Sequence, residues 1–492
     1  MGLALLSGLL YALSLPGWGL WPLAWFSLLP LLVALRKRGR RDGLLLGLLA
    51  GTVASLGALY WVVVAVNRYG EIPLPLALPI LLLLALYLGS YWGLFGLGAT
   101  VFLERGGVLS SVGISALWVL LEFLRAHLLT GFPWGMLAHS QYKLVPLLQI
   151  CDLTGAYGLS FLIALGNGAL FLLLEERRPW GLVLFGALLL TALSYGLVRL
   201  KTPFAGGSIR VGVVQGNVDQ AIKWDEARKR AILLLHRGLT LGLKGGDPRL
   251  VIWPETAFPG YFPEGELSQT LKEIPREMGA YFLFGALSRE GGKVFNSAVL
   301  LSPSGAPLGR YDKLHLVPFG EFIPLRRYLE PLFGQLASLG DITPGEEMTV
   351  FRLPEGDFSV LICFEVIFPE LARAAVLRGA DFLVTITNDA WFGRTAAPYQ
   401  HLAQVVFRAV ENRVWFARAA NTGISAIVDP WGRVLKATGI FTKEAFVAEV
   451  GIREGPFTLY CRWGDLFVLG CVGLFILSAW PRRPSRGRSS ST

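Results

Sequence analysis

Long apolar runs dominate the first 200 residues of this 492-residue chain, and short charged or Pro/Gly-rich stretches separate them. A helix needs about 20 consecutive apolar residues to cross the hydrocarbon core of a bilayer. The whole chain is 53% hydrophobic and only 16% charged, a composition that would leave a soluble protein with apolar surface after its core was filled. The sequence therefore predicts an integral membrane protein.

The apolar runs predict a multi-helix transmembrane domain of about eight helices, seven in the first part of the chain and one near its C-terminus. Met1–Leu15 has no basic residue at its start and further apolar runs follow it, which disfavours a cleaved signal peptide. The run at 74–103 is longer than a bilayer is thick, so that helix must tilt or overhang. The predicted spans are Leu3–Leu15, Trp21–Leu35, Gly43–Val66, Leu74–Leu103, Val108–Leu129, Gly158–Leu174, Trp180–Val198 and Leu466–Trp480.

Every second connection between these spans is basic, most clearly Arg36–Arg41 and Arg482–Arg488. Cytoplasmic loops of membrane proteins carry an excess of Lys and Arg, and this excess accounts for the net charge of +10. No basic stretch is interleaved with base-stacking aromatic residues, so no nucleic acid partner is expected. We expect a multi-pass protein of the cytoplasmic (inner) membrane. Its predicted parts are a transmembrane domain at 1–200, an extracytoplasmic (periplasmic) domain at 208–452, a transmembrane helix at 463–481 and a basic cytoplasmic tail at 482–492.

The predicted extracytoplasmic domain has an α/β pattern, because short β-branched runs alternate with amphipathic helical stretches. Ser302–Gly305 and Asp429–Gly432 each place Pro second and Gly fourth, which is typical of a type I turn between two strands. Strands mixed with helices and hairpins favour an α/β sandwich over a doubly wound parallel sheet. The expected strands are Ile209–Gln215, Leu250–Trp253, Tyr281–Ala286, Ser297–Leu301, Phe358–Cys363, Phe382–Thr387 and Ile424–Val428.

Three reactive side chains follow strand-like runs in this domain: Glu255, Lys313 and Cys363. Strand ends are where loops converge in layered α/β folds, so these groups are candidates for one site. A thiol attacks as thiolate, which requires a base to take its proton or a cation to stabilise its charge. From spacing alone, however, a core cysteine beside two surface charges is the favoured interpretation, because any domain of this size contains all three residue types.

The segments around these residues resemble the three motifs of the nitrilase superfamily. They are Trp253-Pro254-Glu255, the run from Tyr311 to Glu321, and Ile362-Cys363-Phe364-Glu365; Asn388–Gly393 with Gln400-His401 resembles a fourth segment. The resemblance implies an α-β-β-α sandwich in which Glu255 is the general base, Lys313 stabilises the intermediate and Cys363 is the nucleophile. It also implies supporting roles for Glu321, Phe364 and Glu365. Phe364 stands where the family often has Tyr, but its backbone N–H remains available for the oxyanion.

The membrane half resembles that of one branch of this superfamily, the apolipoprotein N-acyltransferases. Together with the sheet-domain motifs, the resemblance to this branch spans nearly the whole chain. The segments that carry this resemblance are Glu122 with Arg125, Gly131–Trp134, Ser140-Gln141 and Gly155–Gly158. Lys223-Trp224-Asp225 resembles the tryptophan-bearing loop of that branch, so Trp224 is expected to contact substrate. Glu122 and Arg125, at i and i+3 on one helix, are also placed to pair with each other near the membrane surface.

The resemblance implies a two-step acyl transfer that needs no cofactor. Cys363 takes an acyl chain from the sn-1 ester of a membrane phospholipid, and the thioester passes it to the N-terminal cysteine α-amine of a diacylglyceryl apolipoprotein. Two alternatives remain open: a membrane-tethered nitrilase-like amidase that uses water as acceptor, and a transporter or scaffold with an inactive domain. The segment 322–336 is apolar with basic residues, so we expect a flap at the membrane interface, with Arg326 and Arg327 near lipid headgroups.

The other chemical candidates are weaker. Cys151, Cys461 and Cys471 form no CxxC pair with one another or with Cys363, and no HExxH is present, so neither a metal site nor a disulfide framework is predicted. His315 and His401 raise the possibility of a Cys–His pair, but structural hydrogen bonding is the favoured role for both.

Overall fold

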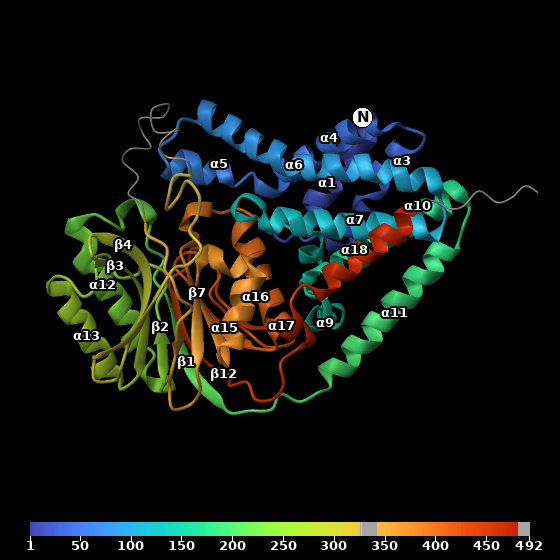
Figure 1. The fold of residues 1–492 in the computed structure, drawn as a ribbon. Coiled ribbons are helices and arrows are strands. Elements are labelled where there is room, and N and C mark those ends of the chain that lie inside the picture. Colours follow the sequence, from blue (N-terminus) through green and yellow to red (C-terminus); the bar gives the residue numbers. More distant parts are fainter. Residues whose placement is uncertain (325, 327–341, 481–492) are drawn as a thin grey trace, which may run out of the picture.

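The N-terminal half of the protein is a bundle of helices packed beside a sheet domain (Figure 1). The computed structural model describes residues 1–324, 326 and 342–480. Within them, five helices are long and apolar enough to cross a membrane. They are α4 (Arg40–Leu59), α6 (Leu74–Arg105), α7 (Val108–His127), α10 (Ala156–Glu176) and α11 (Trp180–Leu200).

Three of the expected spans are not single helices long enough to cross a bilayer, so the expected total of eight is not confirmed. The first and last are α1 (Gly2–Ser14) and α18 (Leu466–Ala479), with 13 and 14 residues. The second is divided into η1 (Trp21–Leu23), α2 (Ala24–Ser27) and α3 (Leu29–Leu35), with a proline in the first turn of α3. Proline lacks the N–H that would continue a helical hydrogen-bond ladder, so it starts a new helix more readily than it extends one.

The expected span Gly43–Val66 is interrupted, because α4 ends at Leu59. After α4 the chain forms the short α5 (Val62–Val64) and a π-helical turn, η2 (Ala65–Tyr69). By contrast, α6 contains 32 residues. At 1.5 Å per residue it extends about 48 Å, well beyond the roughly 30 Å of hydrocarbon in a bilayer. That this helix tilts or overhangs in a bilayer stays a prediction.

Helices α4 and α6 pack closely because glycines line their contact. A Cβ atom added to Gly47 would lie 2.2 Å from the backbone oxygen of Trp92, and one added to Gly96 would lie 2.1 Å from that of Gly43. Small residues let helix backbones approach in membranes, where van der Waals packing replaces the hydrophobic effect as the main source of association. Any side chain at these positions would push the two helices apart.

Replacing Gly96 with Leu is therefore expected to lower the thermal unfolding temperature of the detergent-solubilised protein. Overpacking in a dense interface costs about 1–3 kcal/mol and more where backbone atoms must separate. Gly186→Leu on α11 is the matched control, because a Cβ there meets nothing within 4 Å. Equal unfolding temperatures for the two variants would mean that the α4–α6 contact is not tightly packed.

The sheet domain contains two six-stranded sheets. The first has the order β12 (Glu444–Gly451), β1 (Ser208–Gln215), β2 (Leu250–Ile252), β3 (Tyr281–Glu290), β4 (Lys293–Leu301) and β5 (Pro307–Asp312). The second has the order β11 (Val434–Ala437), β10 (Ala426–Val428), β9 (Trp415–Ala420), β8 (Phe382–Thr387), β7 (Phe358–Ile362) and β6 (Val350–Phe351).

Both predicted turns join neighbouring antiparallel strands. In the β4–β5 turn the N–H of Gly305 donates to the carbonyl of Ser302 at 2.8 Å, and in the β10–β11 turn Gly432 donates to Asp429 at 2.9 Å. The centre of each sheet is parallel, β1–β2–β3 in one and β7–β8–β9 in the other. The sheets are therefore mixed, as the combination of hairpins and helices predicted.

The sheets stack face to face and helices cover their outer faces, which gives the expected α-β-β-α sandwich. Strand β2 illustrates the alternation: Leu250 and Ile252 belong to the core between the sheets, whereas Val251 belongs to a second core beneath the helices. The covering helices are α12 (Glu226–Leu241) and α13 (Glu266–Met278) on the first sheet, and α15 (Pro369–Leu377) and α16 (Ala397–Asn412) on the second.

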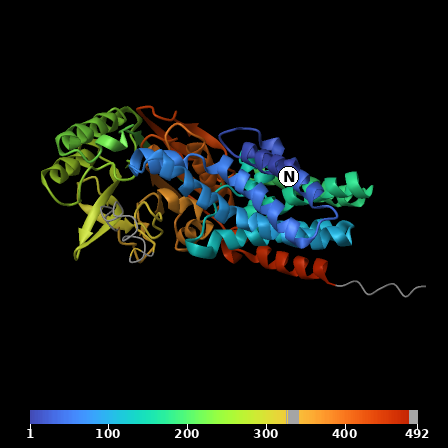
Figure 2. The ribbon, with the colours of Figure 1, turned by 90° about the horizontal axis from the view of Figure 1, so that it is seen from above.

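The second sheet's helices face the membrane half, and α16 is at the centre of the contact (Figure 1). Gln400 on α16 accepts hydrogen bonds from the indole N–H groups of Trp61 and Trp134, at 3.2 and 2.7 Å, and donates to the carbonyl of Ala58 at 3.2 Å. Viewed from above, the helical half extends to one side of the sheet domain (Figure 2). One buried amide thus joins two segments of the membrane half to the domain.

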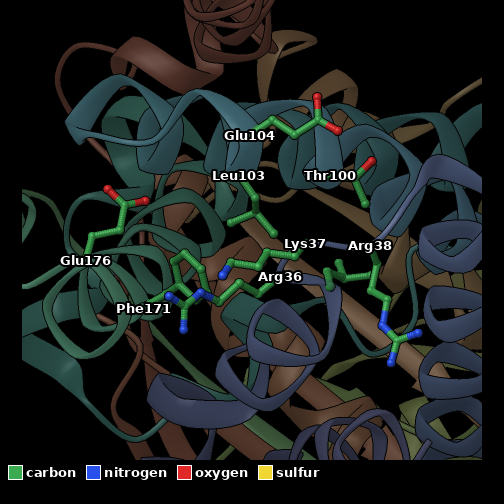
Figure 3. A pocket seen from close by; sticks show the side chains of 9 residues that line it. Arg36, Lys37, Arg38, Thr100, Leu103, Glu104, Phe171 and Glu176 are labelled. Atoms are coloured by element: carbon green, nitrogen blue, oxygen red, sulfur yellow. The ribbon is translucent and has the colours of Figure 1, made fainter.

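A hollow of about 230 Å³ lies between α3, α6 and α10 at their charged ends (Figure 3). Arg36, Lys37 and Arg38 line it together with Glu104 and Glu176. Arg36 forms an ion pair with Glu175 beside it. None of the residues that line this hollow belongs to the predicted catalytic set.

Candidate active site

The three predicted catalytic residues meet where strands from both sheets end. Glu255 follows β2 and Lys313 follows β5 in the first sheet, whereas Cys363 follows β7 in the second. All three are buried, with 7%, 1% and 8% of their surfaces exposed, respectively. The thiol lies close enough to both charged groups for each to act on its pKa. The interpretation of a core cysteine beside two surface charges is therefore wrong.

The Lys313 ammonium lies between two carboxylates. Its Nζ is 2.8 Å from Glu321 Oε2 and 3.6 Å from Glu255 Oε1. Burial opposes the charge on the ammonium, but the two carboxylates together outweigh it and raise the pKa of Lys313. The group is therefore a fixed cation at neutral pH, suited to stabilising negative charge on a neighbouring atom.

Asn296 on β4, which the sequence patterns did not predict as a site residue, links the two carboxylates. Its Nδ2 donates to Glu255 Oε1 at 2.8 Å and to Glu321 Oε1 at 2.9 Å. Its backbone oxygen also accepts from the N–H of Lys313 at 2.9 Å. The other Glu255 oxygen accepts from the N–H of Asn388 at 2.9 Å. Glu255 is therefore held from three sides, by Asn296, Asn388 and Lys313.

Cys363 occupies a strained backbone position at the start of a short 3₁₀ helix, η8 (Cys363–Ile367). Its φ angle is +53°, which lies in the left-handed region that few residues other than glycine adopt. His401 Nε2 donates to the Cys363 carbonyl at 3.1 Å. The histidine thus fixes the backbone of the cysteine rather than pairing with its thiol, which agrees with the structural role expected for His401.

Glu365 ties this cysteine turn to the segment after Lys313. One oxygen accepts from the N–H of Ile362 at 2.6 Å, and the other accepts from the Tyr311 hydroxyl and from the N–H groups of Leu314 and His315 at 2.8, 2.7 and 3.1 Å. Burial raises the pKa of Glu365 to about 7, although these donors and Lys313 oppose the rise. All four partners are protein groups, so this carboxylate holds the two catalytic segments together.

Burial raises the pKa of the Cys363 thiol, the charge on Glu255 raises it further, and Lys313 opposes both effects. The thiol is therefore in its neutral form at neutral pH. A neighbouring carboxylate is the type of group that can take its proton during attack. The arrangement is suited to nucleophilic catalysis by a thiolate that exists only transiently.

A buried polar cluster supports the site from behind. Asp389 and His401 lie 2.9 Å apart, and Arg418 Nη2 lies 2.7 Å from Asp389 Oδ2. Burial disfavours the charge on Asp389, but Arg418 and His401 outweigh it and hold the pKa of Asp389 at about 2. The ion pair between Asp389 and Arg418 compensates for the cost of burying both charges.

The remaining predicted residues lie at the margins of the site. Phe364 is half-buried, and its ring centre is 6.3 Å from that of Phe132 in the membrane half. Trp224 is 40% exposed and is thus available to a ligand. Arg326 is partly exposed. Arg327 and most of the predicted flap at 322–336 lie outside the described residues.

His315 and the remaining cysteines have structural surroundings. Burial and the nearby Lys313 lower the pKa of His315 to about 4, and its ring packs 3.8 Å from that of Phe368. Cys151, Cys461 and Cys471 are buried free thiols. Among the residues that the structure describes, no group of three His, Cys, Asp or Glu side chains is arranged to hold a metal ion.

Two family models match the chain and together cover most of it. Residues 7–169 match the model described as Apolipoprotein N-acyltransferase N-terminal domain, and residues 210–454 match Carbon-nitrogen hydrolase. Among solved structures, an amidase from Nesterenkonia sp. aligns with 55% of this chain and 98% of its own, at 22% sequence identity and a TM-score of 0.41.

Curated relatives match over almost their whole length. An apolipoprotein N-acyltransferase from Geobacter metallireducens is 42% identical over 487 residues, which cover 96% of this chain and 92% of the relative. One from Azotobacter vinelandii is 34% identical, with coverages of 98% and 95%. The apolar helices and these relatives together identify a multi-pass membrane protein. The chain belongs to the apolipoprotein N-acyltransferase family.

Proposed function

We propose that this protein transfers a fatty acyl chain from a membrane phospholipid to the N-terminal cysteine α-amine of diacylglyceryl apolipoproteins, by way of a thioester on Cys363. Family membership supports an acyltransferase that acts on a lipoprotein. The observation that carries the assignment to this site is the buried cluster of Cys363, Glu255 and Lys313 at the converging strand ends. It supplies a nucleophile, a base and a fixed cation together.

In the first half-reaction the thiol proton passes to Glu255 as sulfur attacks the ester carbonyl of the phospholipid. Negative charge then develops on the carbonyl oxygen, where the Lys313 ammonium and the N–H of Phe364 stabilise it. The intermediate collapses by breaking the ester C–O bond, and the leaving lysophospholipid oxygen takes the proton from Glu255. The products are an acyl thioester on Cys363 and a free lysophospholipid.

In the second half-reaction the α-amine of the lipoprotein attacks the thioester. Glu255 accepts a proton from the amine, the C–S bond breaks, and the proton returns to the thiolate of Cys363. An amide forms and the enzyme is regenerated, so no cofactor or oxidant is consumed. A thioester suits this step because amines cleave it readily, provided that the site limits competing attack by water.

The packing of the two halves supports a membrane-held substrate. The ring of Trp134 in the membrane half packs 5.4 Å from the ring of His401, which holds the Cys363 backbone. Arg68 at the end of the η2 turn forms an ion pair at 3.8 Å with Asp219, in the loop that carries Trp224. Segments of the membrane half thus contact both the backbone support of Cys363 and the loop of Trp224, which supports a substrate held in the membrane.

Mass spectrometry of the intact purified protein after mixing with phosphatidylethanolamine vesicles tests this function. The expected result is a mass increase equal to one acyl chain, mapped by peptide analysis to Cys363, with an equivalent amount of lysophospholipid released. A peptide with a diacylglyceryl N-terminal cysteine should then remove the adduct and gain an amide-linked chain. The same peptide with an acetylated α-amine is the control and should leave the adduct in place.

The amidase alternative is distinguished by the fate of the adduct. If water is the natural acceptor, the thioester should disappear at the same rate with either peptide and release free fatty acid. Absence of any adduct on Cys363 in the presence of phospholipid would contradict the proposed function.

The proposal also places the sheet domain on the extracytoplasmic side of the membrane, which a pair of introduced cysteines tests. Gly39 lies in the basic loop before α4 and Gly207 directly precedes β1; both are exposed, and a Cβ at either position meets nothing within 4 Å. In spheroplasts, a membrane-impermeant maleimide should label the Gly207→Cys variant, and should label the Gly39→Cys variant only after the membrane is permeabilised. The opposite pattern would reverse the orientation and exclude lipoprotein acceptors on the outer face.

A further inference from the structure

A second buried lysine, Lys223, also contacts the predicted catalytic cluster. The sequence singled it out only as the neighbour of Trp224. It lies between η5 (Gln220–Ile222) and α12, and only 2% of its surface is exposed. Its Nζ donates to the backbone oxygen of Glu255 at 3.2 Å and to the hydroxyl of Thr256. A buried lysine is rare unless its charge has a partner, so its contact with the backbone of the predicted base calls for an explanation.

The turn that Lys223 holds is strained. Thr256 has a φ angle of +45°, a left-handed conformation that is unfavourable for a β-branched residue. The adjacent backbone is tightly packed, because a Cβ at Gly285 would lie 2.4 Å from the N atom of Thr256. The ammonium is bonded to both residues of the turn. Asn296 and Asn388 hold the Glu255 carboxylate, and Lys223 holds its main chain.

The loop that carries Lys223 is itself anchored to the site. Gln220 Oε1 accepts from Asn388 Nδ2 at 2.6 Å, and the carbonyl of Val218 accepts from Asn421 Nδ2 at 2.7 Å. After the lysine, Asp225 caps the start of α12 by accepting from the N–H of Ala227. The position of the ammonium is therefore set by the fold on both sides, rather than by chance packing of a long side chain.

A count of charges at the site gives the ammonium a second role. Glu255 and Glu321 are both within ion-pair distance of Lys313, so these three groups alone carry one net negative charge. That excess would oppose formation of a thiolate at Cys363. A second cation makes the cluster neutral, and it stays neutral when the thiol proton moves to Glu255.

We propose that Lys223 is a positioning residue of the active site, which fixes the Glu255–Thr256 turn and supplies the second positive charge that stabilises the Cys363 thiolate. The inference rests on the proposed nucleophilic role of Cys363. Two titratable groups act on the ammonium, Glu255 after β2 and Cys363 after β7, and the ammonium itself acts on His236 of α12. Burial lowers the pKa of Lys223 to about 8, while Glu255 and Cys363 oppose this effect. Its charge is therefore present at neutral pH and is lost in mildly alkaline solution.

Alkylation of Cys363 by iodoacetamide, followed by peptide mass spectrometry from pH 6 to 10, tests the inference on the full-length protein without any lipid. Lys223→Met should lower the alkylation rate at pH 7 about tenfold, which corresponds to a rise of about one unit in the thiol pKa. The difference from the unmodified protein should shrink above about pH 8, where the lysine loses its charge. Lys223→Arg should restore most of the rate, and Lys244→Met, at an exposed lysine, should leave it unchanged.

Lys223→Gln separates the charge from the hydrogen bond, since it keeps an N–H donor without a charge, and it should be as slow as Lys223→Met. The inference is wrong if Lys223→Met alkylates with the same pH profile as the unmodified protein. It is also wrong if Met, Gln and Arg replacements are equally slow, or if none of the three yields folded protein, because the lysine would then be purely structural. Since iodoacetamide requires no acyl donor, these outcomes are independent of whether phospholipid forms the thioester.

Discussion

Cys363→Ser is expected to abolish acyl transfer, leaving no acyl adduct and no amide product after incubation with phospholipid and lipopeptide. Serine keeps the shape of the turn, but its hydroxyl is a far weaker nucleophile than a thiol when the only base is a carboxylate. Intact-mass measurement detects the missing adduct, and a lipopeptide mobility assay detects the missing product. Circular dichroism and the thermal unfolding temperature should be close to those of the unmodified protein, because the exchanged atoms are similar in size.

The other three cysteines provide the control for this result. Cys151, Cys461 and Cys471 are buried within helical packing, so their replacement by alanine together should lower stability modestly and leave acylation largely intact. If the triple variant were inactive but folded, and Cys363→Ser were active, the nucleophile would have to be sought elsewhere.

Glu255→Gln and Lys313→Ala are each expected to lower the rate of thioester formation by about 10²- to 10⁴-fold. Glutamine preserves the hydrogen bonds to Asn296 and Asn388 in part but cannot accept the thiol proton. Alanine at 313 removes the cation and leaves Glu255 and Glu321 without their shared partner. Rapid-quench mass spectrometry of the acyl adduct gives the rate of this step alone.

The double variant distinguishes a shared step from two independent effects. Residues that act as one unit lose most of their effect with the first replacement, so the double variant should be little slower than the slower single one. Losses that multiply would indicate that the two residues act in different steps. Glu347→Gln and Lys244→Ala, at exposed positions outside the site, serve as matched controls for the change of charge.

Seven of the twelve described strands and the proposed catalytic residues were predictable, for different reasons. Runs such as Leu250–Ile252 and Phe358–Ile362 are apolar on both faces because each sheet is covered on both sides, and such runs are conspicuous in a sequence. Glu255, Lys313 and Cys363 follow directly from resemblance to known motifs. Asn296 was missed because it lies within β4, the strand next to the edge of its sheet. The role of an asparagine at such a position becomes visible only when the neighbouring strands and loops are placed beside it.

The membrane half was less predictable in detail. Hydropathy identifies apolar runs but does not reveal where a helix breaks: prolines divide Trp21–Leu35, and the end of α4 at Leu59 has no signal in hydropathy. Lys223 was noted only as the neighbour of Trp224. A lysine in a polar loop normally predicts exposure, and only the three-dimensional contacts with Glu255 and Thr256 reveal that this one is buried.

The amide of Gln400 limits how the two halves of this protein can be exchanged during evolution. It is bonded to Trp61, Trp134 and Ala58, and the next residue, His401, holds the backbone of Cys363. A chimaera that grafted this sheet domain onto the helices of another family member would need indole donors at 61 and 134 and the same position of the backbone carbonyl at 58. Mismatched indoles would leave a buried amide unsatisfied one residue away from the group that fixes the nucleophile. Substitutions at this contact in the membrane half are therefore expected to alter the geometry of the proposed catalytic site, and the two halves are expected to co-vary there across the family.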